Sequence, residues 1–238
     1  IGQPIARSDG FEKVTGRAQY TGDIKLPGML WGKALRSPFA HARIISIDTS
    51  RAVDLPGVHA VLTGDDTRGV RYGRRLFDVP PLAEDSVLFA GERVAAVAAE
   101  SIDIAQKAID LIEVEYDPLP AITDPLESMK SDAFLLHPNV NDYVGLPKKL
   151  ENVSNVFVTN TWGKGDVDKG FAQADHILER TYTTPLVHQA YLEPHSCVVF
   201  IDEDQRIQIW AANKAPFALR QQLAAAIGVD EAKIRLNP

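Results

Sequence analysis

The chain has 238 residues, 45% of them hydrophobic and 24% charged, a composition typical of a soluble globular protein with one large or two modest domains. Its formal net charge of −7 argues against a nucleic-acid-binding surface, because phosphate binding requires clustered cations and the densest cationic stretch, residues 68–75, holds four arginines in a predicted loop. No apolar run reaches the roughly 18 residues of a membrane span and no charged-then-apolar leader is seen, so we expect a cytoplasmic protein without a membrane partner.

The first half of the chain shows the pattern of a mixed α/β domain. Strands are predicted at residues 30–35, 42–47 and 58–62. The short apolar run at 93–100 is compatible with a strand or a helix. Ser101 is a plausible helix N-cap, because apolar residues follow it at helical spacing as far as Ile112. A strand at 113–116 and several prolines then end the domain near Asp124.

A weaker pattern separates this unit from a second one. Residues 125–154 show no sustained period and are predicted to be a linker. New strands are predicted at 156–161, 176–183, 197–201 and 206–210, followed by a helix at 216–227 with Pro216 in its first turn and Gly228 at its end. The second sheet looks unfinished. Since the chain starts at Ile1 without an initiator Met and stops at Pro238 just after a strand entry, either end can be a cut.

Two local clusters offer candidate chemistry. His188, Glu193 and His195 are metal-ligand types, but His188 and Glu193 would point to opposite faces of a strand and Pro194 would interrupt a helix, so a packing segment is the preferred interpretation. The lone Cys197 cannot form an internal disulfide or hold a cluster alone. We predict that it is a buried structural thiol and not a nucleophile.

Two further segments have simpler structural interpretations. The glycine-rich stretch at 162–170 lacks the spacing of a phosphate-binding loop, and Asp166 with Asp168 lacks the remaining ligands of a calcium loop. The acidic triplet at 202–204 is predicted to be a hairpin turn. Local chemistry therefore predicts a mixed α/β protein with no convincing active site and no metal ligands.

Whole phrases of the sequence, taken together, resemble one protein family. The phrases run in chain order through Arg7 with Asp9, residues 13–16, Ala18, Tyr20 with Asp23, residues 36–44, Ile47-Asp48, residues 56–58 and 61–63, residues 91–97, 114–116 and 119–121, residues 165–167, 189–194 and 210–217. On these residues the chain resembles the N-terminal portion of the molybdopterin-binding large subunit of the molybdenum hydroxylases, the xanthine dehydrogenase and aldehyde oxidase family.

The resemblance implies a domain organisation that agrees with the pattern above. Residues 1–15 would be a lead segment, 16–124 an α/β hammerhead domain, 125–154 a linker, and 155–238 the start of a molybdenum-cofactor-binding domain. The implied fold class is α+β, or mixed α/β. The family's Gly-Gly-Phe-Gly stretch and its general-base glutamate lie after the position of Leu236, so the resemblance implies no catalytic residue before Pro238.

The resemblance also implies a chemistry. Family members hydroxylate a purine, an N-heterocycle or an aldehyde with oxygen derived from water, and pass electrons through 2Fe-2S clusters, usually to FAD. The implied cofactor is molybdopterin, in its cytosine dinucleotide form, shared with the rest of the large subunit or a second molybdopterin subunit. The 2Fe-2S clusters and FAD would lie on partner subunits, consistent with the lone Cys197.

One position within the chain departs from the family in a place that bears on the cofactor. Many members have a glutamine just before the Ala-Pro of the 210–217 block, and that glutamine hydrogen-bonds an oxygen ligand of molybdenum. Here the residue is Lys214, which carries a charge and only donates hydrogen bonds. Lys214 is the candidate cofactor-binding residue; contact with the same oxygen, binding of a nearby phosphate and exposure to solvent all remain open.

Other functions stay open at this point. A non-catalytic scaffold or assembly protein that retains the fold is the main alternative, motivated by Lys214 and by the glycine stretch placed beyond Leu236. An unrelated soluble binding domain is a third. Neither the substrate nor the electron acceptor can be chosen from these residues.

Overall fold

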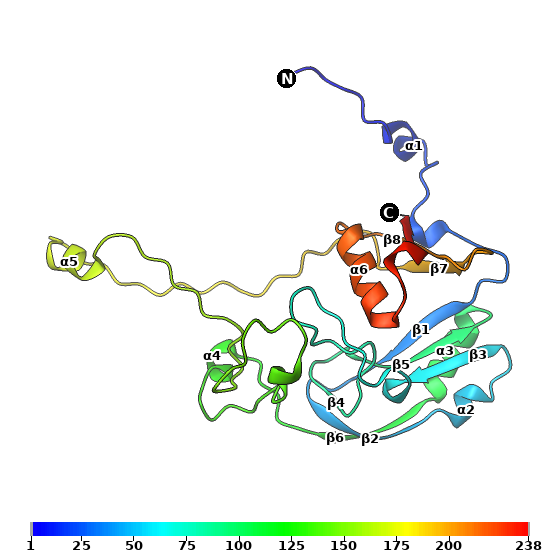
Figure 1. Cartoon of the computed structure of the whole chain (residues 1–238), viewed down its shortest axis with the longest axis horizontal. Coiled ribbons are helices and arrows are strands. Elements are labelled where there is room, and N and C mark those ends of the chain that lie inside the picture. The colour runs from blue at the N-terminus through cyan, green and yellow to red at the C-terminus, as the bar shows by residue number, and fades with distance from the viewer. Residues whose placement is uncertain (1, 238) are drawn as a thin grey trace.

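The computed structural model describes residues 2–237, in which two units of secondary structure are joined by a long excursion of the chain (Figure 1). The helices are α1 (Gly10–Val14), α2 (Ser50–Val53), α3 (Ile102–Leu111), α4 (Pro125–Ser128), α5 (Val167–Ala172) and α6 (Pro216–Ile227). The strands are β1 (Trp31–Arg36), β2 (Ala42–Asp48), β3 (Val58–Thr63), β4 (Ser86–Val87), β5 (Arg93–Ala99), β6 (Glu113–Pro118), β7 (Cys197–Ile201), β8 (Ile207–Ala211) and β9 (Ile234–Asn237). Short 3-10 helices lie at η1 (Thr21–Asp23), η2 (Gly64–Thr67), η3 (Val140–Asp142) and η4 (Glu231–Lys233). Within the described part of the chain, no helix is both long enough and apolar enough to cross a bilayer.

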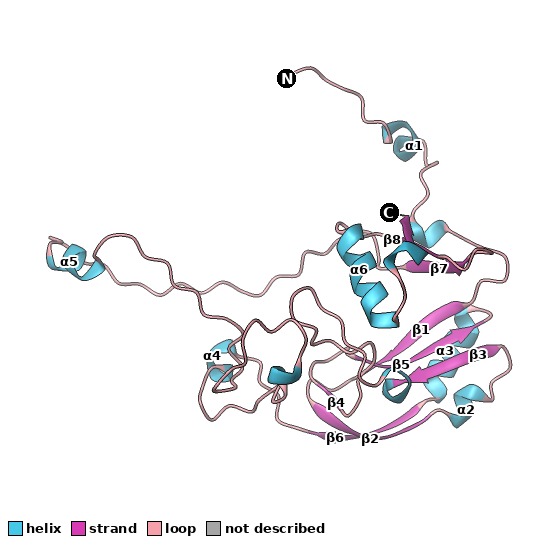
Figure 2. Cartoon of the chain, in the orientation of Figure 1, coloured by secondary structure: helices cyan, strands magenta, loops and turns pink. Residues whose placement is uncertain are grey.

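The first unit contains two antiparallel sheets. One has the order β1-β5-β3 and the other the order β4-β2-β6. Helix α3 packs against β1 and β5, as Figure 2 shows with helices in cyan and strands in magenta. The strands predicted at 30–35, 42–47, 58–62 and 113–116 are confirmed as β1, β2, β3 and β6, and the mixed α/β class is confirmed with them.

Strand β5 is the centre of this unit, and it resolves the ambiguity at residues 93–100. Ala95 and Ala99 are fully buried in the cluster that includes α3 residues Ala105 and Ala108. Val94, also fully buried, belongs to a second cluster with residues of β2 and β4. Because both faces of β5 are covered, its sequence lacks the alternation that marks a half-buried strand.

Helix α3 begins where the sequence predicts. The Ser101 side-chain oxygen accepts a hydrogen bond from the amide of Ile104 at 3.2 Å, and so satisfies one of the free donors of the first turn. The helix ends at Leu111, and β6 follows almost at once.

Residues 125–154 lie against the first unit. The Phe134 ring packs on His41 with 4.7 Å between ring centroids. The Phe77 amide donates to the Val144 carbonyl at 2.9 Å. The Asn155 amide group donates to the Phe134 carbonyl at 2.7 Å. The interval therefore contributes contacts to the first unit as well as connecting it to the second.

The second unit is a small sheet with one helix. Strands β7 and β8 pair antiparallel, and β9 joins β8 in parallel. Ile209, Ala224 and Ile234 form its buried cluster beneath α6. The predictions at 197–201, 206–210 and 216–227 are confirmed, and Gly228 ends α6 with the left-handed φ of 68° that glycine adopts at low cost.

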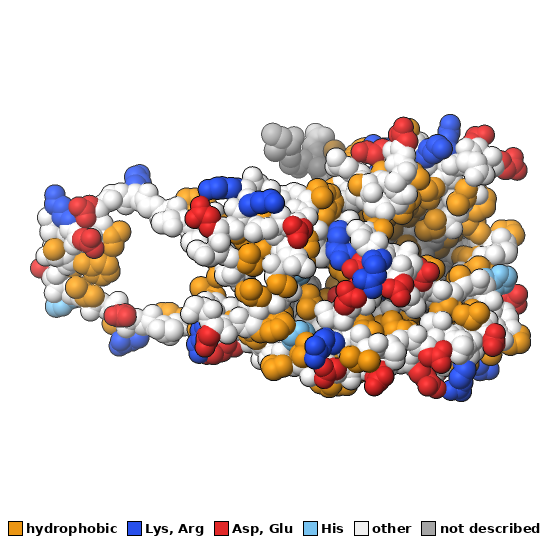
Figure 3. Space-filling model, turned by 60° about the horizontal axis from the view of Figure 1, so that its bottom comes forward, with side chains coloured by type: hydrophobic (Ala, Val, Ile, Leu, Met, Phe, Trp, Pro, Cys, Tyr) orange, Lys and Arg blue, Asp and Glu red, His pale blue; other side chains and the backbone are white. Residues whose placement is uncertain are grey.

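The excursion between the units, residues 157–196, is exposed at every position; we call it the arm. It contains only helix α5, and Figure 3 shows it projecting from the body with hydrophobic side chains on its surface. The prediction of strands at 156–161 and 176–183 is wrong, because neither range forms a strand in the structure. A strand forms only where its backbone groups find a partner, and residues 2–237 offer this segment none.

Candidate functional site

Lys214 lies at the entrance to helix α6, directly after β8 and two connecting residues. It is exposed, and residues 2–237 provide it with no ion pair. The preceding Asn213 shapes the turn, since its side-chain oxygen accepts from the Ala215 amide at 2.6 Å. Lys214 is thus placed by a fixed turn between a strand and a helix.

The first turn of α6 adds unpaired donors beside Lys214. Ala215 is the N-cap and gives no side-chain cap, and Pro216 has no amide hydrogen. The Leu219 amide pairs with the Ala215 carbonyl at 3.0 Å, which leaves the amides of Phe217 and Ala218 without an acceptor within the described chain. Lysine is unfavourable at the positive end of a helix dipole, so a cation here together with free N–H groups suits an anionic ligand.

The 189–194 block lies near the same sheet. Glu193 lines a cavity of about 360 Å³ together with Tyr20, with Trp210 of β8 and with Asn237 of β9. The N-terminal segment and the second unit therefore meet around this glutamate. The cavity contains carboxylate, hydroxyl and aromatic groups, and the Glu193 side chain makes no hydrogen bond within residues 2–237.

His188 and His195 are brought near one another through Tyr191. The His188 and Tyr191 ring centroids are 5.4 Å apart, and Tyr191 and His195 stack at 4.7 Å. The Ala190 amide donates to His188 Nδ1 at 3.0 Å, in a turn where Ala190 has a left-handed φ of 50°. The block is an exposed aromatic turn, and Glu193 lines the separate cavity described above.

Cys197 does not match its prediction. It is exposed at the start of β7, an edge strand of the second sheet. The prediction of a buried thiol is wrong, because Cys197 stays exposed although η1 contacts β7. Asp202, in contrast, holds the predicted hairpin turn by accepting from the Gln208 side chain and the Arg206 amide, both at 2.8 Å, and these contacts lower its pKa.

The first unit contains a polar cluster that sequence reasoning did not identify as a site. Arg71 donates to both oxygens of Glu84 at 2.7 Å, and the Gly69 amide donates to the same carboxylate at 2.8 Å. The Arg71 hydrogen bonds lower the pKa of Glu84 despite its partial burial. The residues are 13 apart and no motif links them, so only the folded loop brings them together.

Glu92 is the buried acid of the same region. Its carboxylate accepts from the Leu88 amide at 2.6 Å, and burial raises its pKa. It closes the turn before β5, and it lines a cavity of about 190 Å³ with His137 and Tyr143, which contact each other at 3.1 Å. Residues 136–143 therefore border the first unit at this cavity.

Comparison with known proteins assigns both units. Residues 15–120 match the family described as aldehyde oxidase and xanthine dehydrogenase, a/b hammerhead domain. Residues 149–238 match the molybdopterin cofactor-binding domain. The chain belongs to the molybdenum hydroxylase family of xanthine dehydrogenases and aldehyde oxidases. The predicted resemblance to the N-terminal portion of the large subunit is confirmed, so the first unit is the hammerhead domain and the second the start of the cofactor-binding domain.

Individual relatives show how much of a large subunit this corresponds to. The chain is 36% identical over 231 residues to a probable xanthine dehydrogenase component of Bacillus subtilis (strain 168), covering 97% of this chain and 29% of the relative. It is 38% identical over 236 residues to the carbon monoxide dehydrogenase large chain of Afipia carboxidovorans, covering 97% of this chain and 29% of that relative. The crystal structure of quinoline 2-oxidoreductase from Pseudomonas putida 86 superposes with a TM-score of 0.85 and 30% identity, covering 99% of this chain and 30% of that chain. The chain therefore spans less than a third of these relatives.

The Arg71–Glu84 pair yields a prediction about the hammerhead domain. Replacing Glu84 with Gln leaves Arg71 without its carboxylate and should lower the free energy of unfolding by about 2 kcal/mol at pH 7. Because the folded-state pKa of Glu84 is lowered, its contribution is full above the unfolded pKa and is lost as pH falls through the folded value. Chemical denaturation of both proteins should therefore show the difference shrinking below about pH 4.

A matched control is available in the same domain. Glu113 pairs with Arg51 at 2.8 Å, but both side chains are more than 60% exposed. Glu113→Gln should change the free energy of unfolding by less than about 0.5 kcal/mol at any pH. Equal effects of the two substitutions, or a Glu84 effect that does not depend on pH, would contradict the assignment.

Proposed function

We propose that this chain is a portion of a molybdenum-dependent hydroxylase, to which it contributes the hammerhead domain and one side of the cofactor site. The observation that carries the proposal is the match of residues 149–238 to the molybdopterin cofactor-binding domain. The geometry at Lys214 supports it, because the cation and the free amides of Phe217 and Ala218 suit an anionic group.

The residues of this chain that would hold the cofactor are Lys214 and the first turn of α6. The molybdopterin cofactor, proposed in its cytosine dinucleotide form, bears phosphates and oxygen ligands, and the ammonium of Lys214 can donate to either. When bound, the cofactor supplies the redox chemistry of hydroxylation. Lys214 would orient it and balance its negative charge, and a base from outside this chain would move the proton.

The exposed arm supports the proposal that the chain works only with the rest of a large subunit. Trp162 is 88% exposed and Leu192 99%, values that a stable isolated surface rarely shows for large apolar side chains. The superposition on quinoline 2-oxidoreductase covers 99% of this chain, and so includes the arm. We propose that the isolated chain is inactive and that the remainder of the large subunit, or a second molybdopterin subunit, completes the site.

The proposed partners and substrate follow from the same assignment. One relative is described as a large chain and another as a large molybdopterin subunit. We propose a 2Fe-2S subunit and an FAD subunit as redox partners in the cytoplasm. The proposed substrate is a small purine, N-heterocycle or aldehyde. Of the relatives described above, one is named for quinoline and another for carbon monoxide.

Metal analysis of the native complex tests the proposal. A complex purified from the source through a tag on this chain should contain about one molybdenum atom per chain by mass spectrometry of the metals, together with the visible absorbance of iron–sulfur clusters. A colourless, metal-free oligomer of this chain alone would contradict the proposal and favour the scaffold function.

Substitution of Lys214 tests its role within that complex. Removing one charge-assisted contact should reduce cofactor retention about tenfold to a hundredfold in Lys214→Ala, measured as molybdenum per chain after dialysis. Lys214→Gln, which can still donate a hydrogen bond, should retain molybdenum and keep or raise activity. Lys233→Ala is the control, because Lys233 is an exposed lysine of η4 at the other end of α6. Equal molybdenum content in the Lys214→Ala and Lys233→Ala enzymes would show that Lys214 is merely solvated.

A further inference from the structure

One loop of the hammerhead domain is closed by hydrogen bonds between its two ends. The amides of Tyr72 and Val79 donate to each other's carbonyls at 2.9 and 3.1 Å, so the ends of the loop form a bridge. The Arg93 side chain donates to the Tyr72 hydroxyl. Leu76 at the loop centre is buried. We call residues 72–79 the arginine loop.

Two glycines allow the backbone of the arginine loop to pack closely on itself and on residues 144–145. A Cβ on Gly73 would lie 1.9 Å from the Leu76 carbonyl oxygen. A Cβ on Gly145, which has a left-handed φ of 94°, would lie 1.9 Å from the Arg75 carbonyl oxygen. Any side chain at either position would displace the loop. The backbone at Arg75 is therefore held from within the loop and by residues 144–145.

The charges around the arginine loop are unevenly paired. Arg68 donates to Asp65 at 2.8 Å and to Asp85 at 3.0 Å, and Arg71 donates to Glu84. Arg74 and Arg75, in contrast, are both exposed, and no carboxylate of residues 2–237 pairs with either. In a chain of net charge −7, two adjacent guanidinium groups on a bridged loop are thus left without a counter-charge from the described residues.

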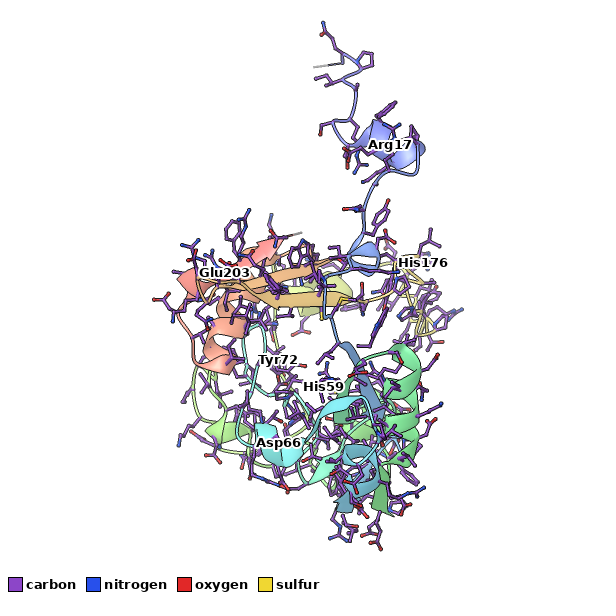
Figure 4. All side chains as sticks on the ribbon, turned by 90° about the vertical axis from the view of Figure 1, so that its right-hand side faces the viewer. Arg17, His59, Asp66, Tyr72, His176 and Glu203 are labelled. Atoms are coloured by element: carbon purple, nitrogen blue, oxygen red, sulfur yellow. The ribbon has the colours of Figure 1, made fainter. Side chains whose placement is uncertain are left out.

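The arginine loop lies where the two domains approach each other. A cavity of about 430 Å³ at its base is lined by Arg71 and Phe77 on the hammerhead side and by Ala225 and Ala226 of α6. Figure 4 shows the labelled Tyr72 between the second sheet and the strands of the hammerhead domain. The base of the arginine loop therefore lies at the junction of the two domains.

We propose that Arg74 and Arg75 form a docking point for an acidic surface of another polypeptide in the assembled enzyme. Arginine is always charged, and its planar group pairs with carboxylates through two parallel hydrogen bonds. A backbone bridged between Tyr72 and Val79 and closely packed at Gly73 and Gly145 loses less conformational freedom on binding than a mobile loop does. The inference rests on the proposed function in so far as it needs a multi-subunit enzyme.

The geometry favours a protein surface over a small anionic ligand. Small-molecule sites are concave and enclose most of the ligand, whereas Arg74 and Arg75 are both exposed on a bend of the loop. Exposed arginines are common at the centres of protein interfaces, where they pair with acidic residues of the partner. Charge pairs of this kind accelerate association and fix the orientation of the partner.

Charge reversal in the native complex tests the proposal. The variant Arg74→Glu/Arg75→Glu is expressed in the source and purified as the holoenzyme. Dissociation of the complex is measured by mass photometry over a dilution series at low and high salt. The matched control is Lys25→Glu/Lys107→Glu, which reverses two other exposed cations of this chain that have no ion pair within residues 2–237. Circular dichroism confirms folding, and the milder Arg74→Gln/Arg75→Gln variant provides a second measurement of the same effect.

We expect the arginine variants to lose at least about tenfold in affinity for the partner polypeptide at low salt, with molybdenum per chain unchanged, while the control assembles like the wild type. Arg74→Lys/Arg75→Lys should recover most of the affinity. Unchanged assembly of the arginine variants would overturn the proposal, as would intact assembly with a raised KM for an anionic substrate, which would assign the loop to a small ligand. A wild-type complex without molybdenum would instead refute the proposed function and leave the dissociation measurement interpretable.

Discussion

The hammerhead domain depends on the close contact between helix α3 and strand β5. Ala95 and Ala99 on the strand and Ala105 and Ala108 on the helix are all fully buried, so the helix backbone lies near the sheet and larger side chains fill the margins. The opposite face of β5 is covered through Val94. With both faces buried, this strand holds its neighbours β1 and β3 in place, and the loops that carry the Arg71–Glu84 pair and the arginine loop are positioned by that core.

The ends of the helices and the half-buried strands could be predicted from the sequence because their signals are local. Ser101 caps the start of α3 and Gly228 ends α6, and both effects depend only on neighbouring backbone groups. The half-buried strands show alternation that can be recognised without a structure. Residues 93–100 could not be decided, since a strand buried on both faces has no alternation, and the Arg71–Glu84 pair could not be found because it joins positions that only the fold brings together.

In the second half of the chain, sequence patterns alone do not predict the structure. Residues 156–161 and 176–183 have the side chains of strands, but pairing depends on partners that the described chain lacks. Cys197 has the character of a core residue but is exposed at the start of the edge strand β7. The proposed cofactor site shares this condition, because we propose that Lys214 and the first turn of α6 form one side of it and that other residues of the enzyme supply the complementary side.

We propose that the hammerhead domain folds within this chain and that the cofactor-binding domain is completed by the rest of the large subunit. Hydrogen–deuterium exchange measured on the chain alone and within the assembled enzyme tests it most directly. The account predicts strong protection of β5 and α3 in both samples and protection of residues 157–196 only in the assembled enzyme. Protection of the arm in the isolated chain, or rapid exchange of the arm in the assembled enzyme, would contradict the account.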